Sequence, residues 1–219
     1  MINGKQIVAP PEEVQLEGSS YWQNYLVGHF VGQRPAFLVV SSIAKSLWSK
    51  DGLQEVIAQA NGYIFFKFLE AKGVNAVLEH GLWFIAGRFL VLKKWEQNLN
   101  LSEAAAVTKI PIWVLLYDVP VELWTPKGLS YIASAAGTPL FADTTTVSRK
   151  RLSYARVCIE IEAGAELIEE IFLTSGTSDD PCADTIKVKV VYQWQPAQCS
   201  HCRVFGHSYN TCPNNPECK

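Results

Sequence analysis

The sequence lacks the long apolar runs that membrane-spanning and secreted proteins need. No run approaches the ~18 apolar residues of a membrane helix. The first residues, MINGKQIVAPPEE, contain no apolar signal segment. We therefore expect an intracellular protein, in the nucleus or the cytoplasm, with no membrane partner. In that setting cysteine thiols stay reduced rather than forming disulfides.

Motifs that carry catalysis are also missing. The sequence has no G-x-S-x-G, no phosphate-binding P-loop and no H-E-x-x-H. It has only four histidines, and two of them, His201 and His207, lie in one short cysteine-rich stretch. We predict that the chain is not an enzyme and takes no small-molecule substrate.

Positive charge is scarce as well. The net charge is −2, and charged residues make up 18% of the chain against 48% hydrophobic residues. This composition is typical of a packed globular protein and not of a disordered chain. Because neutralising phosphates dominates affinity for nucleic acid, any such binding has to come from local basic patches.

What the sequence does contain is a dense metal-binding pattern, CSHCRVFGHSYNTC, at residues 199–212. Its spacing is C-x2-C-x4-H-x4-C, and the four candidate ligands are Cys199, Cys202, His207 and Cys212. Gly206 allows the chain to bend just before the histidine. Three sulfur donors and one nitrogen donor close a tetrahedral structural zinc site. We predict one structural Zn²⁺, which supplies the folding free energy that so short a segment cannot obtain from a core.

Other assignments of these side chains stay open. The even count of six cysteines also fits disulfides. His201 is a rival ligand, although it lies inside the C-x2-C turn. Cys218 fits a free thiol better than a fifth ligand. A polar lead-in precedes the cluster, so we expect this segment to fold independently of the rest of the chain.

The residues before the cluster repeat one order of elements. In the first half the patterns predict a strand (21–32), a helix from Pro35, a hairpin at Asn61-Gly62, a helix (70–81) and a strand or small hairpin (83–95). In the second half they predict strands at 110–120, 151–162 and 185–194, a helix at 125–137, a weak strand near 140–147, and a short helix or irregular segment at 165–173.

This order predicts an α+β fold. It suits two ferredoxin-like β-α-β-β-α-β units, the topology of RNA-recognition motifs, followed by a small CCHC zinc knuckle. The predicted boundaries are a flexible N-terminal arm (1–20), a first unit (21–95), a connector (96–110), a second unit (111–195) and the knuckle (199–212).

Two strands of these units carry candidate nucleic-acid contacts. Strand alternation places Tyr63, Phe65 and Lys67 on one face of the segment NGYIFFKF, and three apolar side chains on the other. That face either binds RNA or is buried. In the second unit Tyr154 and Arg156 share a face. The stretch from 144 to 159 contains no acid and four bases, either a phosphate-contacting patch or a solvated loop: Arg149, Lys150, Arg151 and Arg156.

The four ligands resemble the CCHC zinc knuckle of retroviral nucleocapsid and retrotransposon proteins. That resemblance implies binding of single-stranded nucleic acid by base stacking. Tyr209 and Phe205 would form the platform, and Arg203 would contact phosphate. Ser200 stands where such knuckles usually carry an aromatic residue directly after the first cysteine, so one stacking wall is missing.

A wider resemblance covers residues 20–213. It rests on the stretches FVGQRPAF, VLEHGLWFIAGRFLVLKKW, IPIWVLLYDVPVELWTPKGLSYIASAAGTPL, RLSYARVCIEI and VVYQWQPAQCSHCRVFGH. Together they resemble the plant domain of unknown function that precedes a CCHC knuckle in LINE-type retrotransposon proteins and their genomic relatives. The resemblance implies a zinc-dependent binder of single-stranded nucleic acid, RNA more than DNA, with possible self-association. The alternative is a domesticated protein-interaction adaptor with a structural knuckle.

Overall fold

The computed structural model describes residues 8–97, 99, 107–174, 185–195, 197–212 and 214. The chain divides into two compact units. The first contains most of residues 8–99, and the second contains residues 107–214 together with the short loops 31–33 and 81–83. Most of the predicted connector, the first residues of the predicted arm and Cys218 lie outside the described residues.

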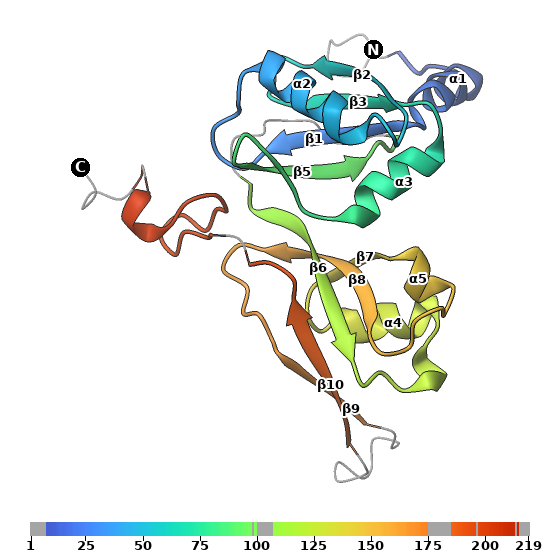
Figure 1. Ribbon diagram of the computed structural model, residues 1–219, viewed down its shortest axis with the longest axis vertical. Coiled ribbons are helices and arrows are strands. Elements are labelled where there is room, and N and C mark those ends of the chain that lie inside the picture. The colour runs from blue at the N-terminus through green and yellow to red at the C-terminus, as the bar shows by residue number, and fades with distance from the viewer. Residues whose placement is uncertain are drawn as a thin grey trace. The chain divides into compact units, whose positions relative to one another are not determined.

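The first unit is a five-stranded antiparallel sheet with helices (Figure 1). In chain order its elements are α1 (Glu12–Trp22), β1 (Tyr25–Phe30), α2 (Phe37–Trp48), β2 (Leu53–Ala58), β3 (Ile64–Phe68), α3 (Ala71–His80), β4 (Trp83–Ile85) and β5 (Arg88–Lys94). The strand order is β2-β3-β1-β5-β4, with β1 antiparallel to both β3 and β5. Apart from α1 and the short β4, this is the predicted β-α-β-β-α-β order.

Two tight turns fix the register of this sheet. Between β2 and β3, Gly62 has a φ of +95°, and the Tyr63 N–H donates to Asn61 Oδ1 at 3.3 Å. Between β4 and β5, Ala86 and Gly87 have φ values of +51° and +72°. Positive φ at both central residues is the mark of a type I′ hairpin turn. The sequence predicted the first hairpin, and it offered the second as one of two alternatives.

The core of the first unit lies on one face of the sheet, beneath α2 and α3. Ile64, Phe66 and Phe68 of β3 are at most 1% exposed. The Trp48 ring of α2 meets the Phe66 ring edge-on, with centroids 5.0 Å apart. Burying one such side chain stabilises the fold by about 1.5–3 kcal/mol, so this face accounts for much of the unit's stability.

Helix α1 lies within the segment that was predicted to be mostly a flexible arm. Its first turn carries Glu12 and Glu13, which favour a helix N-terminus because they complement the helix dipole. No residue of α1 is fully buried. Contacts at its last residue, Trp22, hold it to the sheet.

The second unit has a second five-stranded antiparallel sheet (Figure 1). Its elements are β6 (Lys109–Tyr117), η1 (Val121–Leu123), α4 (Pro126–Ala133), β7 (Thr138–Ala142), α5 (Thr144–Val147), β8 (Ala155–Glu162), β9 (Glu170–Thr174), β10 (Thr185–Tyr192) and η2 (Tyr209–Thr211). The strand order is β7-β8-β6-β10-β9. Helix α4 buries Leu129, Ile132 and Ala133. The α+β class is therefore confirmed.

Side-chain caps start both helices of this unit. The Thr125 side chain accepts a hydrogen bond from the Gly128 N–H, and Pro126 occupies the first helical turn, as the sequence predicted. The weak strand expected near 140–147 is split: β7 ends at Ala142, and α5 follows. Asp143 accepts from the Thr146 N–H at 2.8 Å and so ends the strand and begins the helix.

The second unit departs from the predicted order at residues 165–173. A short helix or irregular segment was expected there, but residues 170–174 form β9, antiparallel to β10. The run Ile-Phe-Leu-Thr favours a strand once a partner is available, because β preference depends on cross-strand packing. No helix of the described residues stands between β8 and β10. Nor does any described helix have the length and apolar character needed to cross a membrane.

Replacing Gly73 with alanine tests the close packing of α3 in the first unit. A β-carbon at Gly73 would overlap the backbone carbonyl oxygen of Asp51. We expect Gly73→Ala to destabilise the protein by about 1–3 kcal/mol, although alanine is the better helix former. Gly18 of α1 is the matched control, because no atom other than those of its chain neighbours and its own helix backbone lies within 4 Å of its β-carbon position. Urea unfolding that shows equal effects for both variants would contradict this packing.

Candidate metal centre and nucleic-acid interface

The four predicted metal ligands come together in the second unit. The ligand atoms of Cys199, Cys202, His207 and Cys212 all lie within 4.8 Å of one another. Cys202 Sγ and His207 Nε2 are 3.2 Å apart. Zinc–sulfur bonds of about 2.3 Å in a tetrahedron require ligand atoms about 3.8 Å apart, so this cluster has the size of a metal site. The Cys₃His group could hold a metal ion.

The backbone of this segment explains how the ligands meet. The Arg203 N–H donates to the Cys199 carbonyl at 2.9 Å and closes the turn that carries the first two cysteines. Gly206, with a φ of +103°, bends the chain before His207, as predicted. The short helix η2 then returns the chain to Cys212, whose N–H donates to the Tyr209 carbonyl.

The electrostatics around Cys199 favour its thiolate form. Burial alone would raise the pKa of this thiol. Hydrogen bonds from the backbone N–H groups of Cys202 and His201 outweigh this effect. Together with hydrogen bonds from the thiols of Cys212 and Cys202, they lower the pKa of Cys199 to about 6. A thiolate is the form that binds metal. The turn thus prepares the first ligand for coordination.

Phe205 does not form the exposed stacking platform that the sequence suggested. Its side chain is 2% exposed. Its N–H donates to the Val107 carbonyl at 3.0 Å, and Gln198 Oε1 accepts from the Gly164 N–H at 2.8 Å. These contacts tie the knuckle to the second unit and differ from the expectation of an independent knuckle. The knuckle is too short to have a core of its own, so its apolar Phe205 side chain is buried against the rest of the second unit.

The other predicted knuckle contacts remain accessible. Tyr209 is 41% exposed, and its ring lies 6.4 Å from that of His201 in an edge arrangement. Arg203 is exposed and has a φ of +52°. Its aliphatic stem lies beside Gly164. The knuckle therefore offers one exposed aromatic ring and one exposed guanidinium group.

The aromatic face of the first unit is covered by other aromatic side chains of the same unit. Phe65 is 9% exposed and meets the Trp22 ring of α1, with centroids 5.6 Å apart. Trp95 packs on the same cluster. Tyr63 is half-buried, and its ring lies edge-on to His29 at 5.4 Å. Of the two alternatives for this face, the structure therefore favours burial, and Phe65 is not available to a ligand.

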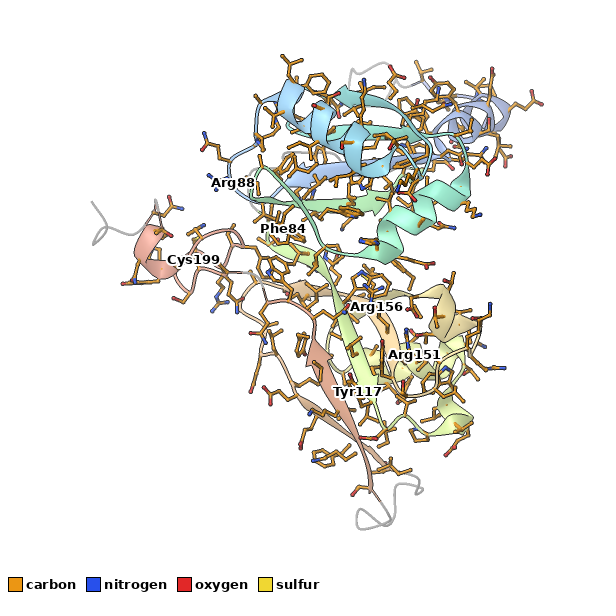
Figure 2. The ribbon with its side chains drawn as sticks, viewed as in Figure 1. Phe84, Arg88, Tyr117, Arg151, Arg156 and Cys199 are labelled. Carbon is orange, nitrogen blue, oxygen red and sulfur yellow. The ribbon has the colours of Figure 1, made fainter. Side chains whose placement is uncertain are left out.

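The corresponding face of the second unit is more open. Tyr117 of β6 is labelled in Figure 2. It and Tyr154, just before β8, are half-buried, and their ring centroids are 5.4 Å apart. Lys189 of β10 pairs with Tyr117 across the sheet and is exposed. The Arg156 guanidinium stacks on Trp113 at 3.8 Å and donates to Gln193 Oε1 at 2.8 Å. This tyrosine–cation face, defined by Tyr117, Tyr154, Arg156 and Lys189, combines aromatic rings with positive charge.

Two arginines of the predicted basic patch, Arg149 and Arg151, make contacts within the second unit. Arg151 makes an ion pair with the buried Asp143 at 3.0 Å and lies over the Tyr154 ring at 4.0 Å. It therefore braces the tyrosine instead of standing free for phosphate. Arg149 donates from Nε to the Trp124 carbonyl. Lys150 is exposed.

Three residues of this surface were not selected from the sequence. Tyr117 lies on the same face of its strand as Trp113 and Leu115, because side chains two residues apart point the same way. Strand periodicity alone could therefore have placed Tyr117 on this surface. Lys189 was placed on a strand face but not assigned a role. Nothing in the sequence around Asp143 indicated a role for it, because its ion pair with Arg151 forms only in the folded unit.

One family model matches part of the chain: residues 18–103 match a domain of unknown function, DUF4283. No curated protein sequence shows a significant match.

Among solved structures, the chain is similar to the RNA-binding domain of Hrp1 in complex with RNA, at 12% identity and a TM-score of 0.30, over 63% of this chain and 80% of that one. It is similar to the C. elegans NONO-1 homodimer at 14% identity and a TM-score of 0.28, over 63% and 49%. A third likeness is to the rna15, hrp1 and anchor RNA ternary complex, at 11% identity and a TM-score of 0.30, over 63% and 80%. Likenesses this distant say nothing about what this chain binds.

Replacing Cys202 tests the metal centre. We expect the purified protein to hold one Zn²⁺ per chain, and Cys202→Ser to lose it, because three ligands no longer close the tetrahedron. His201→Ala is the matched control, since His201 is outside the ligand cluster, and it should keep the metal. Elemental analysis and native mass spectrometry measure both. A Cys202→Ser variant with full zinc content would contradict the assignment.

Acid titration tests the ion pair between Asp143 and Arg151, next to Tyr154. Burial would raise the pKa of Asp143, but hydrogen bonds from Thr146 and Arg151 and the arginine charge bring it below its usual range. A carboxyl with a lowered pKa stabilises the fold above its unfolded pKa of about 3.9, and this stability is lost as the pH falls through the folded pKa.

We therefore expect Asp143→Asn to be less stable at pH 7 by about 1–3 kcal/mol. The gap to the wild type should shrink as the pH falls below about 4. Glu162→Gln, which removes the exposed ion pair with Lys109, should change stability by less than about 1 kcal/mol. Urea unfolding at several pH values measures both, and a constant gap would refute the role of the Asp143 charge.

Proposed function

We propose that this chain is a zinc-dependent nucleic-acid-binding protein of retroelement origin. Its ligand is single-stranded nucleic acid, with RNA preferred over DNA. The observation that carries the proposal is the tyrosine–cation face of the second unit, where two tyrosine rings 5.4 Å apart stand beside Arg156 and the exposed Lys189. Single-stranded binding sites combine these two features, aromatic rings for bases and cations for the backbone.

Each part of this face has a separate role. An unpaired base stacks on Tyr117 or Tyr154, and such a stack contributes about 1–3 kcal/mol. Lys189 of this face neutralises a phosphate, and the exposed Lys150, in the loop before Tyr154, adds a second cation; these charges give the salt-dependent share of the affinity. Arg151 lies over the Tyr154 ring and restrains its orientation. Little side-chain entropy is therefore lost when a base stacks on Tyr154.

The knuckle adds a second, weaker contact. Its zinc ion would be held by Cys199, Cys202, His207 and Cys212, and would supply the free energy that orders the segment. Tyr209 offers one stacking surface and Arg203 one cation. Three thiolates and one Zn²⁺ together carry a net charge of −1, which opposes phosphate binding. We infer that the knuckle alone binds weakly and that the sheet supplies most of the affinity.

The DUF4283 match over residues 18–103 supports the part of the resemblance that concerns a domain of unknown function. We infer from the resemblance a protein that coats element RNA and has no catalytic role. A site closed by four protein ligands leaves no coordination position for a reactive water, which supports binding in place of catalysis.

A protein-interaction adaptor is the second candidate. A cavity of about 240 Å³ lies between α4, β7 and α5 in the second unit. Its wall includes Leu140, Phe141 and Val147, which are 43%, 38% and 56% exposed. Apolar side chains exposed together favour a protein contact.

Replacing Tyr154 separates the two functions. We expect the wild type to bind a fluorescent oligouridylate at low salt, and Tyr154→Ala to bind it about 5- to 150-fold more weakly, because one base stack is lost. Tyr131→Ala is the matched control: Tyr131 is 81% exposed on α4 and is not part of the face. Fluorescence anisotropy measures the dissociation constants.

A salt titration of the same complex tests the phosphate contacts. Lys189→Gln should reduce the slope of log K against log salt by about 0.7 and leave base preference unchanged. Lys45→Gln, on α2 of the first unit, should change neither. Absence of binding by the wild type at low salt would refute the proposal and favour the adaptor.

A further inference from the structure

We propose that β9 extends the nucleic-acid face of the second unit, with Phe172 as an additional base-stacking position. The inference rests on the proposed function and concerns a strand that was not expected from the sequence. Its ligand is the same class, a single strand, but one long enough to pass beyond the two tyrosines.

Strand pairing makes β9 continuous with the tyrosine–cation face. Tyr117 of β6 lies opposite Lys189 of β10, and Lys189 lies opposite Glu170 of β9. Two residues along β9, Phe172 lies opposite Lys187. Residues directly opposite in an antiparallel pair share a face, so all five side chains lie on one side of the sheet.

The burial pattern of β9 shows that Phe172 is not a core residue. Ile171 is 7% exposed and faces the core, whereas Phe172 is 60% exposed. A single exposed apolar side chain is ordinary on a protein surface. What distinguishes Phe172 is its position: it extends a row of aromatic and cationic side chains at the edge of the sheet.

The distances suit one more nucleotide position. Neighbouring strands lie about 4.8 Å apart, so the three steps from β8 to β9 span about 14 Å. Sheets that bind RNA through aromatic side chains stack two or three bases. Tyr154 and Tyr117 account for the first of these, and Phe172 is placed to receive the next.

The charges near β9 favour a base over a phosphate at this end. Glu170 Oε1 accepts from Lys187 Nζ at 2.7 Å, so this carboxylate and this ammonium largely neutralise each other. Lys189 stands between Tyr117 and the Glu170–Lys187 pair and is the cation available to the backbone. A neutral aromatic ring beside a neutralised pair suits an uncharged base.

Oligonucleotide length is the variable that tests this assignment. Wild type, Phe172→Ala, Tyr154→Ala and the control Tyr131→Ala are compared on oligouridylates of about two nucleotides, too short to pass beyond the two tyrosines, and of about ten nucleotides. We expect Phe172→Ala to bind the short oligomer like the wild type and the long one about 5- to 150-fold more weakly. The slope of log K against log salt should not change, because no phosphate contact is lost.

Phe172→Trp and Phe172→Leu separate stacking from simple apolar contact. Tryptophan should match or exceed the wild type on the long oligomer, and leucine should behave like alanine. Equal binding by wild type and Phe172→Ala at both lengths, while Tyr154→Ala is weakened, would overturn the role of β9 and leave the proposed function intact. A loss of the same size at both lengths would also overturn it. Failure of the wild type to bind either oligomer would refute the proposed function itself.

Discussion

Each five-stranded sheet in this protein has two faces, and the main core lies on only one of them, beneath α2 and α3 in the first unit and beneath α4 in the second. Alternation along a strand sends half of the side chains to each face, so an uncovered face must carry polar groups, be capped by other residues or bind a partner. In both units the helix-covered face holds the large apolar side chains, such as Phe66 in the first and Ile112 in the second. The other face is therefore where the two units differ.

The two units treat that second face differently. In the first, Trp22 of α1 and Trp95 close over Phe65, and the aromatic face becomes a second small core. In the second, the corresponding rings of Tyr117 and Tyr154 stay half-exposed. Arg151, which forms an ion pair with Asp143, lies over the Tyr154 ring and restrains it, while Tyr154 stays half-exposed. Burial therefore stabilises one unit, and a braced but accessible surface is left on the other.

Local rules predicted most of the elements, and tertiary contacts decided the rest. Asn61-Gly62 and the cysteine spacing at 199–212 specify a turn and a ligand cluster through short-range geometry, so sequence alone was sufficient. The covering of Phe65 was left as one of two alternatives, because it depends on α1 reaching back across the sheet. The inward turn of Phe205 requires Val107, which is distant in sequence. Strand β9 formed only because β10 supplies its backbone partner.

A net charge of −2 limits how such a protein can hold a polyanion. A broad basic surface is not available, and several cations of the second unit are engaged with carboxylates or carbonyl groups. Base stacking does not need charge, so aromatic rings can supply affinity that electrostatics cannot. The Cys₃His knuckle and the sheet belong to one unit, so two weak contacts on one strand would reinforce each other through a high effective concentration. A protein built this way would bind single strands with modest salt dependence, and would discriminate against duplexes, whose bases are already stacked.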